Sequence, residues 1–365
     1  MYLSHLTILN YKNIAEATLD FSPKINCFIG SNGEGKTNVL DAIHFLSFTR
    51  SATNTLDALN IRHGEEMMML SGTYDLEGVE ETFTCGQRLH QKKVFRRGQK
   101  AYKRMSEHIG LLPLIFVSPN DNELILGGSE ERRRFMDIVI SQYNPAYMTS
   151  LIRYNKALQQ RNTLLKEPEQ ADIDSLLSVY EQMMATEGEY IYKERARFID
   201  QLIPLFQHYY DRISAHHEQV TLTYTSHGQR GPLLDIIRCG RAKDLAVGYS
   251  LHGIHRDDLT MLLGGFPIKK EASQGQSKTY LVSLKLAQFD FLCHTGSHTK
   301  PLLLLDDIFD KLDALRVTQL ISLVAEDSFG QIFITDTNRE NLDRILQQSQ
   351  GDYKIFHVQA GNIHA

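Results

Sequence analysis

Apolar and polar residues form patterns along the chain that predict its elements. In the N-terminal third, alternating positions predict strands, and the unbroken apolar run INCFI at 25–29 predicts a buried strand. Apolar residues from Val39 to Leu46 repeat at helical spacing, which predicts a helix ending near Phe48. The other strands predicted here lie within residues 1–29, where two strands flank a turn, and at 67–75, 80–87 and 111–117.

The middle of the chain, from Glu130 to about Gln219, has almost no strand signal. Apolar residues within 151–165 share one helical face, and a second helical repeat begins at Ile173 after a break that contains Pro168. This pattern predicts two antiparallel helices joined by a short turn. Since a helix of about 40 residues reaches at most about 60 Å, we expect an arm rather than a long coiled coil.

The C-terminal third returns to short apolar runs, with one helix predicted at 277–292. The strands predicted in this part lie at 220–224, 258–267, 302–305, 331–335 and 354–363, the last as an edge hairpin. Strand-bearing segments therefore occur at both ends of the chain, with helices between them.

Residues 30–37, GSNGEGKT, have the form of the phosphate-binding P-loop. They stand between a predicted strand and a predicted helix, an order that aims the helix N-terminus at bound phosphates. Glycines let backbone N–H groups curl around phosphate oxygens, Lys36 reaches the β- and γ-phosphates, and the Thr37 hydroxyl is placed to ligate Mg²⁺. The alternative is a glycine turn without a ligand. The predicted ATP-binding residues are Gly30, Ser31, Asn32, Gly33, Glu34, Gly35, Lys36 and Thr37.

Leucines at 302–305 followed by Asp306 and Asp307 match the Walker B pattern. A buried parallel strand delivers its last side chains to the sheet edge where a P-loop also lies. We predict that Asp306, with Thr37, holds Mg²⁺, and that Asp307 is the general base for the attacking water, with Lys36 as the second catalytic residue. Alone, the run followed by two aspartates could simply end a strand.

Ser273-Gln274-Gly275-Gln276 begins a predicted helix between these two motifs, in the place and approximate form of the ABC-type signature. A serine hydroxyl, a glycine N–H and a helix N-terminus together form an anion site. In ABC-type ATPases this site covers the γ-phosphate bound to a second molecule, whereas the alternative is an ordinary helix start. The residues predicted to contact ATP in trans are Ser273, Gly275, Gln276 and Asp313, the last at the D-loop position.

The P-loop and the Walker B strand lie near opposite ends of the sequence, although a compact P-loop enzyme keeps them closer together. A segment is therefore inserted between them. The predicted fold class is α/β, an ABC/SMC-type P-loop ATPase head with an inserted α-helical arm. We place the head at residues 1–122 together with 221–365, and the arm at 123–220.

The net charge of −5 argues against a protein that coats nucleic acid with its whole surface, so any DNA contact must be local or form on assembly. Residues 91–104, QKKVFRRGQKAYKR, contain no acidic residue, and Gly98 would turn a hairpin. This segment is either a solvated hairpin or a contact to DNA phosphates. Its candidate DNA contacts are Lys92, Lys93, Arg96, Arg97, Lys100, Lys103 and Arg104.

A second, weaker candidate for DNA contact is the run Arg132 to Arg134, which could equally pair with Glu130 and Glu131. The four cysteines are scattered and form no C-x-x-C pair, which argues against a zinc site or a disulfide framework. No apolar run approaches the length of about 20 residues that a membrane helix needs, and no signal peptide is evident. We expect a cytoplasmic, nucleoid-associated protein.

Together these blocks resemble the RecF family, bacterial recombinational repair ATPases with ABC/SMC-type heads. The resemblance covers nearly the whole chain. It implies ATP-dependent head-to-head dimerisation and binding to single-stranded, double-stranded and gapped DNA. It also implies cooperation with RecR and RecO in placing RecA on DNA. The blocks that carry it are LTILNYKN, GSNGEGKTNVLDAIHFL, FVSPNDNELILGGSEERRRFMD, YNKALQQRN, GIHRDD, SQGQ and LLLLDDIFDKLD.

Some positions depart from related patterns. Ile254 stands where many family members carry proline, and Thr335 stands where ABC transporters carry a switch histidine. Many ABC heads have glutamate at the position of Asp307. The shorter aspartate would hold the attacking water less well, so we expect slow, DNA-dependent hydrolysis. The alternative is an ATP-gated scaffold of SMC type with negligible hydrolysis.

Two other readings of the GIHRDD block are weak. A protein kinase needs asparagine five residues after the aspartate of His-Arg-Asp, and position 262 is leucine. His252 and His255 have the local spacing of metal ligands but no clear third ligand, so a structural role is the better prediction.

Overall fold

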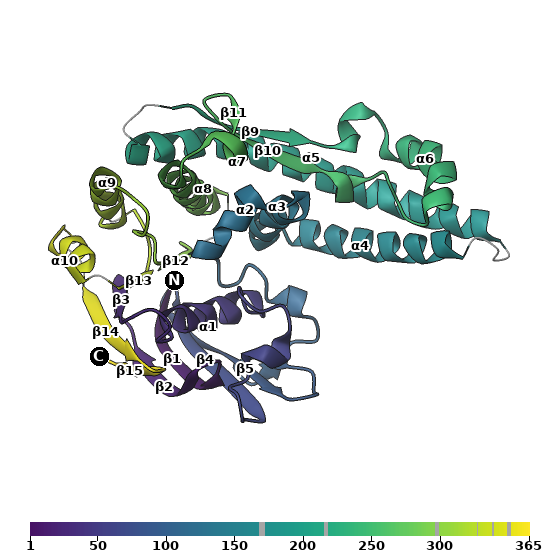
Figure 1. Cartoon of the computed structure of the whole chain (residues 1–365). Coiled ribbons are helices and arrows are strands. Elements are labelled where there is room, and N and C mark those ends of the chain that lie inside the picture. Colours follow the sequence, from purple (N-terminus) through teal and green to yellow (C-terminus); the bar gives the residue numbers. More distant parts are fainter. Residues whose placement is uncertain (168–171, 215–217, 296–298, 327, 338, 349–351) are drawn as a thin grey trace. The chain divides into compact units, whose positions relative to one another are not determined.

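A computed structural model describes residues 1–167, 172–214, 218–295, 299–326, 328–337, 339–348 and 352–365. The chain divides into two compact units. The head unit comprises the described residues of Met1–Asn122, His208–His217 and Ser273–Ala365, and the arm unit those of Glu123–Gln207 and Glu218–Ala272. Figure 1 labels their helices and strands.

The head unit contains a six-stranded sheet of order β15-β14-β3-β13-β12-β8. The strands from β14 to β8 are parallel, and β15 returns antiparallel to β14. Leu303 on β12 stands opposite Ile115 on one side and Ile332 on the other. The strands are β3 (Ile25–Ile29), β8 (Leu114–Val117), β12 (Leu302–Asp306), β13 (Ile332–Asp336), β14 (Tyr353–Gln359) and β15 (Asn362–His364).

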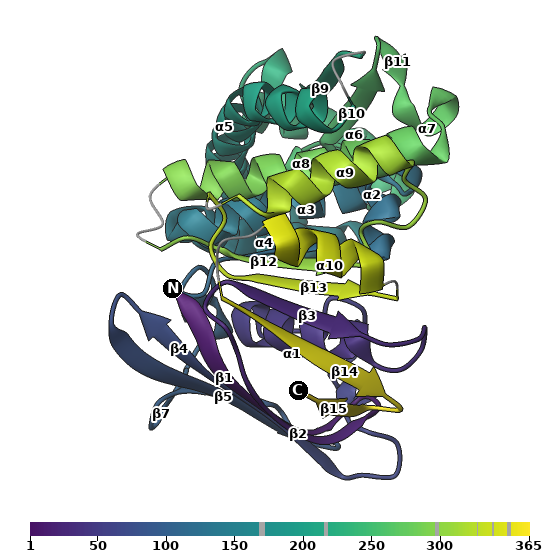
Figure 2. The same ribbon diagram turned by 90° about the vertical axis from the view of Figure 1, so that its left-hand side faces the viewer.

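Helices cover both faces of this sheet, which explains why β12 and β13 are buried along their whole length. Helix α1 (Lys36–Phe48) lies on one face, and α8 (Gln274–His294), α9 (Ala314–Val324) and α10 (Arg339–Gln348) lie on the other (Figure 2). On its far side α1 packs against strands of a second sheet. The parallel sheet with a helix directly after its P-loop strand confirms the predicted α/β class.

The second sheet of the head unit has the order β2-β1-β4-β5-β6-β7 and is antiparallel. Inward and outward positions alternate on β4, which lies where the sequence predicted a strand. Gly98, at a φ of 55°, turns the last hairpin between β6 and β7. The strands are β1 (Tyr2–Tyr11), β2 (Ile14–Asp20), β4 (Met67–Leu76), β5 (Val79–Arg88), β6 (Val94–Arg97) and β7 (Lys100–Ala101).

The arm unit is built on two antiparallel helices, α4 (Pro145–Lys166) and α5 (Ile173–Ser214). The last residues of α5, from His208 on, group with the head unit. Ion pairs from Arg153 to Glu187 and from Arg161 to Glu181 join them. The remaining elements are α2 (Asn122–Leu126), α3 (Ser129–Tyr143), α6 (Leu233–Val247), α7 (Ile268–Glu271) and a small sheet of β9 (Val220–Thr225), β10 (Asp258–Leu263) and β11 (Phe266–Pro267).

The domain boundary drawn from the sequence differs from this division. Residues 221–272 were assigned to the head, but they belong to the arm unit, and the head resumes at Ser273. The reason is that β9 pairs with β10 rather than with a head sheet, and β10 packs against α3. The arm therefore carries a three-stranded sheet of its own and is not purely helical.

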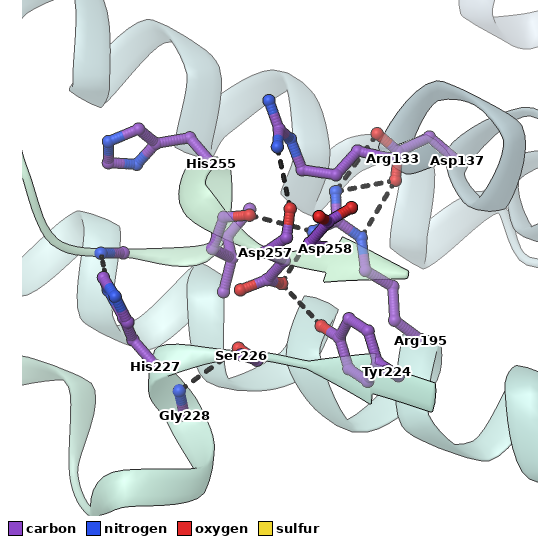
Figure 3. A network of polar contacts seen from close by, with 12 residues as sticks. Arg133, Asp137, Arg195, Tyr224, Ser226, His227, Gly228, His255, Asp257 and Asp258 are labelled. Atoms are coloured by element: carbon purple, nitrogen blue, oxygen red, sulfur yellow. Dashed lines mark hydrogen bonds and ion pairs between the residues drawn. The ribbon is translucent and has the colours of Figure 1, made fainter. Parts of the chain in front are cut away.

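A buried polar network explains why the arm unit closes in this way (Figure 3). Arg195 of α5, 1% exposed, donates to Asp137 of α3 at 2.9 Å and to Asp257 at 2.8 Å. The Tyr224 hydroxyl of β9 donates to the same Asp257 carboxylate, and Arg133 donates to its main-chain carbonyl oxygen. One arginine thus ties α3, α5 and the loop before β10 together.

Candidate nucleotide-binding site

The predicted P-loop connects β3 to the first turn of α1. Gly33 and Gly35 have φ values of 85° and 115°, in the left-handed region that favours glycine. A Cβ at Gly30 would lie 2.3 Å from the carbonyl oxygen of Val358 on β14. The glycines at these positions are therefore required by backbone conformation or by close packing.

A cavity of about 220 Å³ opens beside this loop. Its lining brings together the P-loop, the end of β12, Thr335 of β13 and Pro119, the second residue after β8. The Thr37 hydroxyl donates to both carboxylate oxygens of Asp306, at 3.0 and 2.9 Å. The residues that line the cavity are Asn32, Gly33, Gly35, Lys36, Thr37, Asn38, Pro119, Asp306, Asp307 and Thr335.

Lys36 lies folded over the P-loop, where its ammonium donates to the carbonyl oxygens of Gly30 and Ser31 at 2.7 and 2.9 Å. Burial lowers its pKa, while the nearby carboxylates of Asp307 and Asp306 act in the opposite direction. Its contacts are thus to neutral main-chain oxygens, which an anionic ligand in the cavity could replace.

Asp306, 3% exposed, is a carboxylate enclosed at the end of β12. Burial raises its pKa, although hydrogen bonds from the hydroxyls of Thr335 and Thr37 act to lower it. The Thr335 hydroxyl donates to its Oδ1 atom at 2.6 Å. A buried carboxylate held only by hydroxyl donors favours a cation beside it.

Asp307 adopts a left-handed backbone conformation, with φ at 49°. Its main-chain N–H donates to the Thr335 hydroxyl at 3.1 Å, and its carbonyl oxygen accepts from the Lys278 ammonium at 3.2 Å. Burial and the carboxylates of Asp310 and Asp336 raise its pKa. A non-glycine residue in this conformation is uncommon, and here both of its main-chain groups are held from outside.

The C-terminal hairpin holds the P-loop from the side, a feature that the sequence did not indicate. The main-chain carbonyl oxygen of Glu34 accepts from Gly361 N at 2.9 Å and from the Asn13 side-chain amide at 3.0 Å. The Glu34 carboxylate also accepts from the main-chain N–H of Ala360. The only local signal of this turn in the sequence was Gly361, which together with Ala360 adopts the left-handed conformation.

The residues predicted to act in trans lie together at the starts of α8 and α9. Ser273 caps α8, its hydroxyl accepting from Gln276 N at 3.2 Å, and the Gln276 side-chain oxygen accepts from Ser273 N at 2.8 Å. Asp313 caps α9 and pairs with Arg316 at 3.3 Å. A Cβ at Gly275 would lie 2.8 Å from the Arg316 guanidinium. None of these residues lines the cavity of the same chain, so far as the described residues show.

The predicted basic segment forms the β6–β7 hairpin at the edge of the antiparallel sheet. Lys93 pairs with Asp57 at 2.8 Å, and Arg97 makes a two-pronged contact with Glu81. These two cations are thus partly neutralised inside the head unit. The exposed cations of the segment for which the described residues give no ion pair are Lys92, Arg96, Lys100, Lys103 and Arg104.

The side chains of the weaker basic candidate, Arg132 to Arg134, largely bond within the arm unit. Arg132 pairs with Asp258, donating from Nε at 2.6 Å, and Arg133 donates to the carbonyl oxygen of Asp257 at 2.7 Å. Only Arg134 pairs with a neighbouring glutamate, Glu131, at 3.9 Å. Of the alternative ion pairs with Glu130 and Glu131, the described residues thus give the one between Arg134 and Glu131, while Asp257 and Asp258 supply the acceptors of Arg133 and Arg132.

The histidines of the GIHRDD region have structural contacts. The His255 ring bonds to the Tyr154 hydroxyl at 2.8 Å and to the Ser250 carbonyl oxygen at 3.0 Å. Across the described ranges, no group of three or more histidine, cysteine or acidic residues could hold a metal ion. Likewise, no helix in the described part is both long and apolar enough to cross a bilayer.

The fold and the cavity define the class of protein as an ABC/SMC-type P-loop ATPase head. A family model described as an AAA ATPase domain matches residues 1–231. An Smc head domain from Pyrococcus furiosus has a similar fold, with a TM-score of 0.59 at 16% identity over 99% of this chain and 95% of that one.

Closer relatives give the family. Proteins named DNA replication and repair protein RecF are 57% identical in Phocaeicola vulgatus, over 364 residues, and 58% identical in Bacteroides fragilis, over 365 residues. Each match covers 100% of this chain and 98% of the relative. A solved recombination mediator protein RecF with ATP has a TM-score of 0.89 at 27% identity, covering 100% of this chain and 97% of that one. The chain belongs to the RecF family.

Proposed function

We propose that the chain is an ATP-dependent DNA-binding protein of recombinational repair and replication-fork maintenance. In this proposal ATP drives two heads together, the closed dimer grips DNA, and slow hydrolysis releases it. The observation that carries the proposal is the direct contact between Thr37 and Asp306 in a cavity built from the P-loop. A relative solved with ATP supports it.

ATP would lie with its phosphates against the N-terminus of α1. Lys36 would exchange its two main-chain carbonyl acceptors for the β- and γ-phosphate oxygens, and the P-loop N–H groups would bind the remaining oxygens. Because these donors are already assembled, nucleotide binding needs little rearrangement of the loop.

The Thr37 hydroxyl and the Asp306 carboxylate fit Mg²⁺, which prefers oxygen ligands and is usually bound by one or two carboxylates plus phosphates and water. The bound ion would neutralise phosphate charge. The absence of a larger ligand cluster among the described residues suits this ion better than zinc. Asp307 would hold the attacking water and take its proton.

Ser273, Gly275, Gln276 and Asp313 would contact the γ-phosphate bound to the other head. They lie together at two helix starts yet outside their own cavity, which supports a role across a dimer. ATP and the second head would then stabilise the same closed state, so their affinities are linked.

DNA would bind where the dimer gathers positive charge, with the five exposed cations of the β6–β7 hairpin as first candidates. Gapped or junction DNA is the substrate class that the family suggests. We further propose RecR as a direct partner, with RecO and RecA acting in the same pathway. A solved relative is described as a recombination mediator in the RecFOR pathway.

Light scattering with and without Mg²⁺ and ATP tests the dimer. We expect the molar mass to double with ATP for wild type and for Ser175→Arg, an exposed control on α5. Ser273→Arg and Lys36→Met should remain monomeric, the first with ATP affinity retained and the second without it. A monomer under all conditions would overturn the clamp, even if the cavity still binds ATP.

Measurement of ATP turnover distinguishes this enzyme from the alternative, a scaffold with negligible hydrolysis. Loss of a measurable ATPase rate in Asp307→Asn supports an enzyme, whereas an unchanged rate supports the scaffold. The control is Asp200→Asn, an exposed carboxylate on α5.

A further inference from the structure

Of the four polar residues His255, Arg256, Asp257 and Asp258, three have side chains engaged inside the arm unit. His255 bonds to Tyr154, and Asp258 pairs with Arg132. Asp257 belongs to the Arg195 network (Figure 3). Arg256 is different, because its side chain is exposed. The network therefore fixes the loop and leaves Arg256 presented at the surface.

Arg256 is held in place without being neutralised. Its Nη2 atom donates to the carbonyl oxygen of Ser250 at 3.0 Å, and its guanidinium lies over the Tyr249 ring at 5.5 Å from the centroid. Tyr249 itself is 45% exposed, so much of this aromatic side chain remains accessible. An oriented arginine beside an accessible ring is the pair of groups that binds a phosphate next to a base.

A second arginine and two histidines belong to the same region. Burial lowers the pKa of His227, and the positive charges of Arg230 and Arg256 lower it further. The His227 ring lies 5.3 Å from that of His252, and Arg230 is exposed. Within the described residues, neither Arg230 nor Arg256 makes an ion pair, so the cluster has no internal counter-charge.

The backbone of the cluster is rigidly set. Gly253 has a φ of 135°, its N–H donates to His227 Nδ1 at 3.1 Å, and a Cβ there would lie 2.3 Å from the Tyr154 hydroxyl. Since His227 Nδ1 accepts, the proton of the neutral ring is on Nε2, which is a further donor. Two arginines without acidic partners in the described part of the chain, together with this imidazole donor, are stabilised by an anion that contacts them.

We propose that Arg230, Tyr249 and Arg256, with His227 and His252, form a second DNA contact on the arm unit. It binds a single-stranded segment through two phosphates and one stacked base. This site rests on the proposed DNA-binding function and is separate from the β6–β7 hairpin, which is in the head unit. Its occupant is DNA rather than an acidic protein because an accessible ring beside arginine favours a base over a carboxylate.

The test measures binding of the full-length protein, with Mg²⁺ and ATP, to a fluorescein-labelled poly(dT) strand and to a duplex of equal length over a salt series. The double variant Arg230→Gln/Arg256→Gln should lower the magnitude of the single-strand salt slope by about 1.4, since each phosphate contact contributes about 0.7. Tyr249→Leu should weaken single-strand binding about fivefold or more at an unchanged slope, because stacking is salt-independent.

The matched control is Arg238→Gln/Lys243→Gln, which removes the same charge from exposed positions on α6. It should keep the wild-type slope, and all variants should keep wild-type ATP affinity and thermal midpoint. An unchanged slope in Arg230→Gln/Arg256→Gln, or an equal loss in the control, would overturn this site while leaving the proposed function intact. Equal losses on duplex and single strand would overturn its single-strand character. Failure of wild type to bind any DNA would instead contradict the proposed function itself.

Discussion

The ammonium of Lys278 donates a hydrogen bond to the main-chain carbonyl oxygen of Asp307 across 3.2 Å. Lys278 lies on α8, the helix that Ser273 caps, and Asp307 follows the strand that carries Asp306. Helix α8, which we propose contacts the nucleotide of the partner head, therefore touches Asp307, which we propose acts on the nucleotide bound to the same head. A shift of α8 on dimer formation would reach the Asp307 backbone directly.

Replacing Lys278 with methionine should lower ATP turnover about tenfold, equivalent to about 1.4 kcal/mol in the barrier. The expected cause is loss of the bond that holds Asp307 in its left-handed conformation. ATP affinity should stay within about twofold, because Lys278 does not line the cavity. Steady-state kinetics and a fluorescent-nucleotide titration measure the two quantities.

The matched control is Lys354→Met, which removes a lysine bond to a main-chain carbonyl, that of Asp20, at the opposite end of β3. It should leave turnover unchanged. Wild-type turnover in Lys278→Met would exclude the positioning role.

Gly361→Val should weaken ATP binding about tenfold through the P-loop. Gly361 has a φ of 81°, and a Cβ there would lie 2.4 Å from the carbonyl oxygen of Asn13. The turn would have to move, taking with it the bonds to Glu34. Gly78→Val is the control, since Gly78 has a similar φ of 86° but open space around it. Calorimetric titration should show the affinity loss in Gly361→Val alone, and equal losses would mean that backbone strain is the cause.

Asp307→Asn should raise the thermal midpoint of the nucleotide-free protein by about 1 to 3 °C at neutral pH. Burial and neighbouring carboxylates raise the pKa of Asp307 above its ordinary value of 3.8, so the folded state binds this proton more tightly than the unfolded state. Ionisation therefore lowers stability as pH rises from about that value through the folded-state pKa. The gain in the variant should vanish below about pH 4.

Differential scanning calorimetry over a pH series measures this gain. Asp200→Asn, on an exposed position of α5, should show no comparable increase. A lower midpoint for Asp307→Asn at neutral pH would mean that the carboxylate stabilises the fold, which contradicts the direction of its pKa.

Arg195→Met should destabilise the arm unit by about 3 to 5 kcal/mol, because it leaves the buried carboxylate of Asp257 without its cation. Arg153→Met is the control, since Arg153 pairs with Glu187 but its side chain is 61% exposed. This variant should lose less than about 1 kcal/mol of unfolding free energy. Urea unfolding measures both. Similar losses would mean that the Arg195 network contributes no more than a surface ion pair.

Local sequence patterns determined much of the head unit. The local structure of three segments depends only on neighbours a few residues away. They are the run at 25–29, the glycines of 30–37 and the leucines before Asp306. The spacing of apolar residues and the preference of glycine for turns therefore suffice to predict these segments. Because the carboxyl ends of parallel strands lie at one edge of the sheet, the sequence also predicts that Thr37 lies near Asp306. The helices α6, α9 and α10 were not predicted, although the buried residues of α9 fall at helical spacing.

Tertiary structure alone decided which distant segments meet. The contact of Glu34 with Gly361 and that of Lys278 with Asp307 join residues whose own neighbourhoods give no sign of the partner. The same holds for the boundary at Ser273, since β9 pairs with β10, which packs against α3 more than 100 residues earlier in the chain. Periodicity encodes which face of an element is buried, but the partner that covers this face is chosen by long-range packing and by the charges buried there.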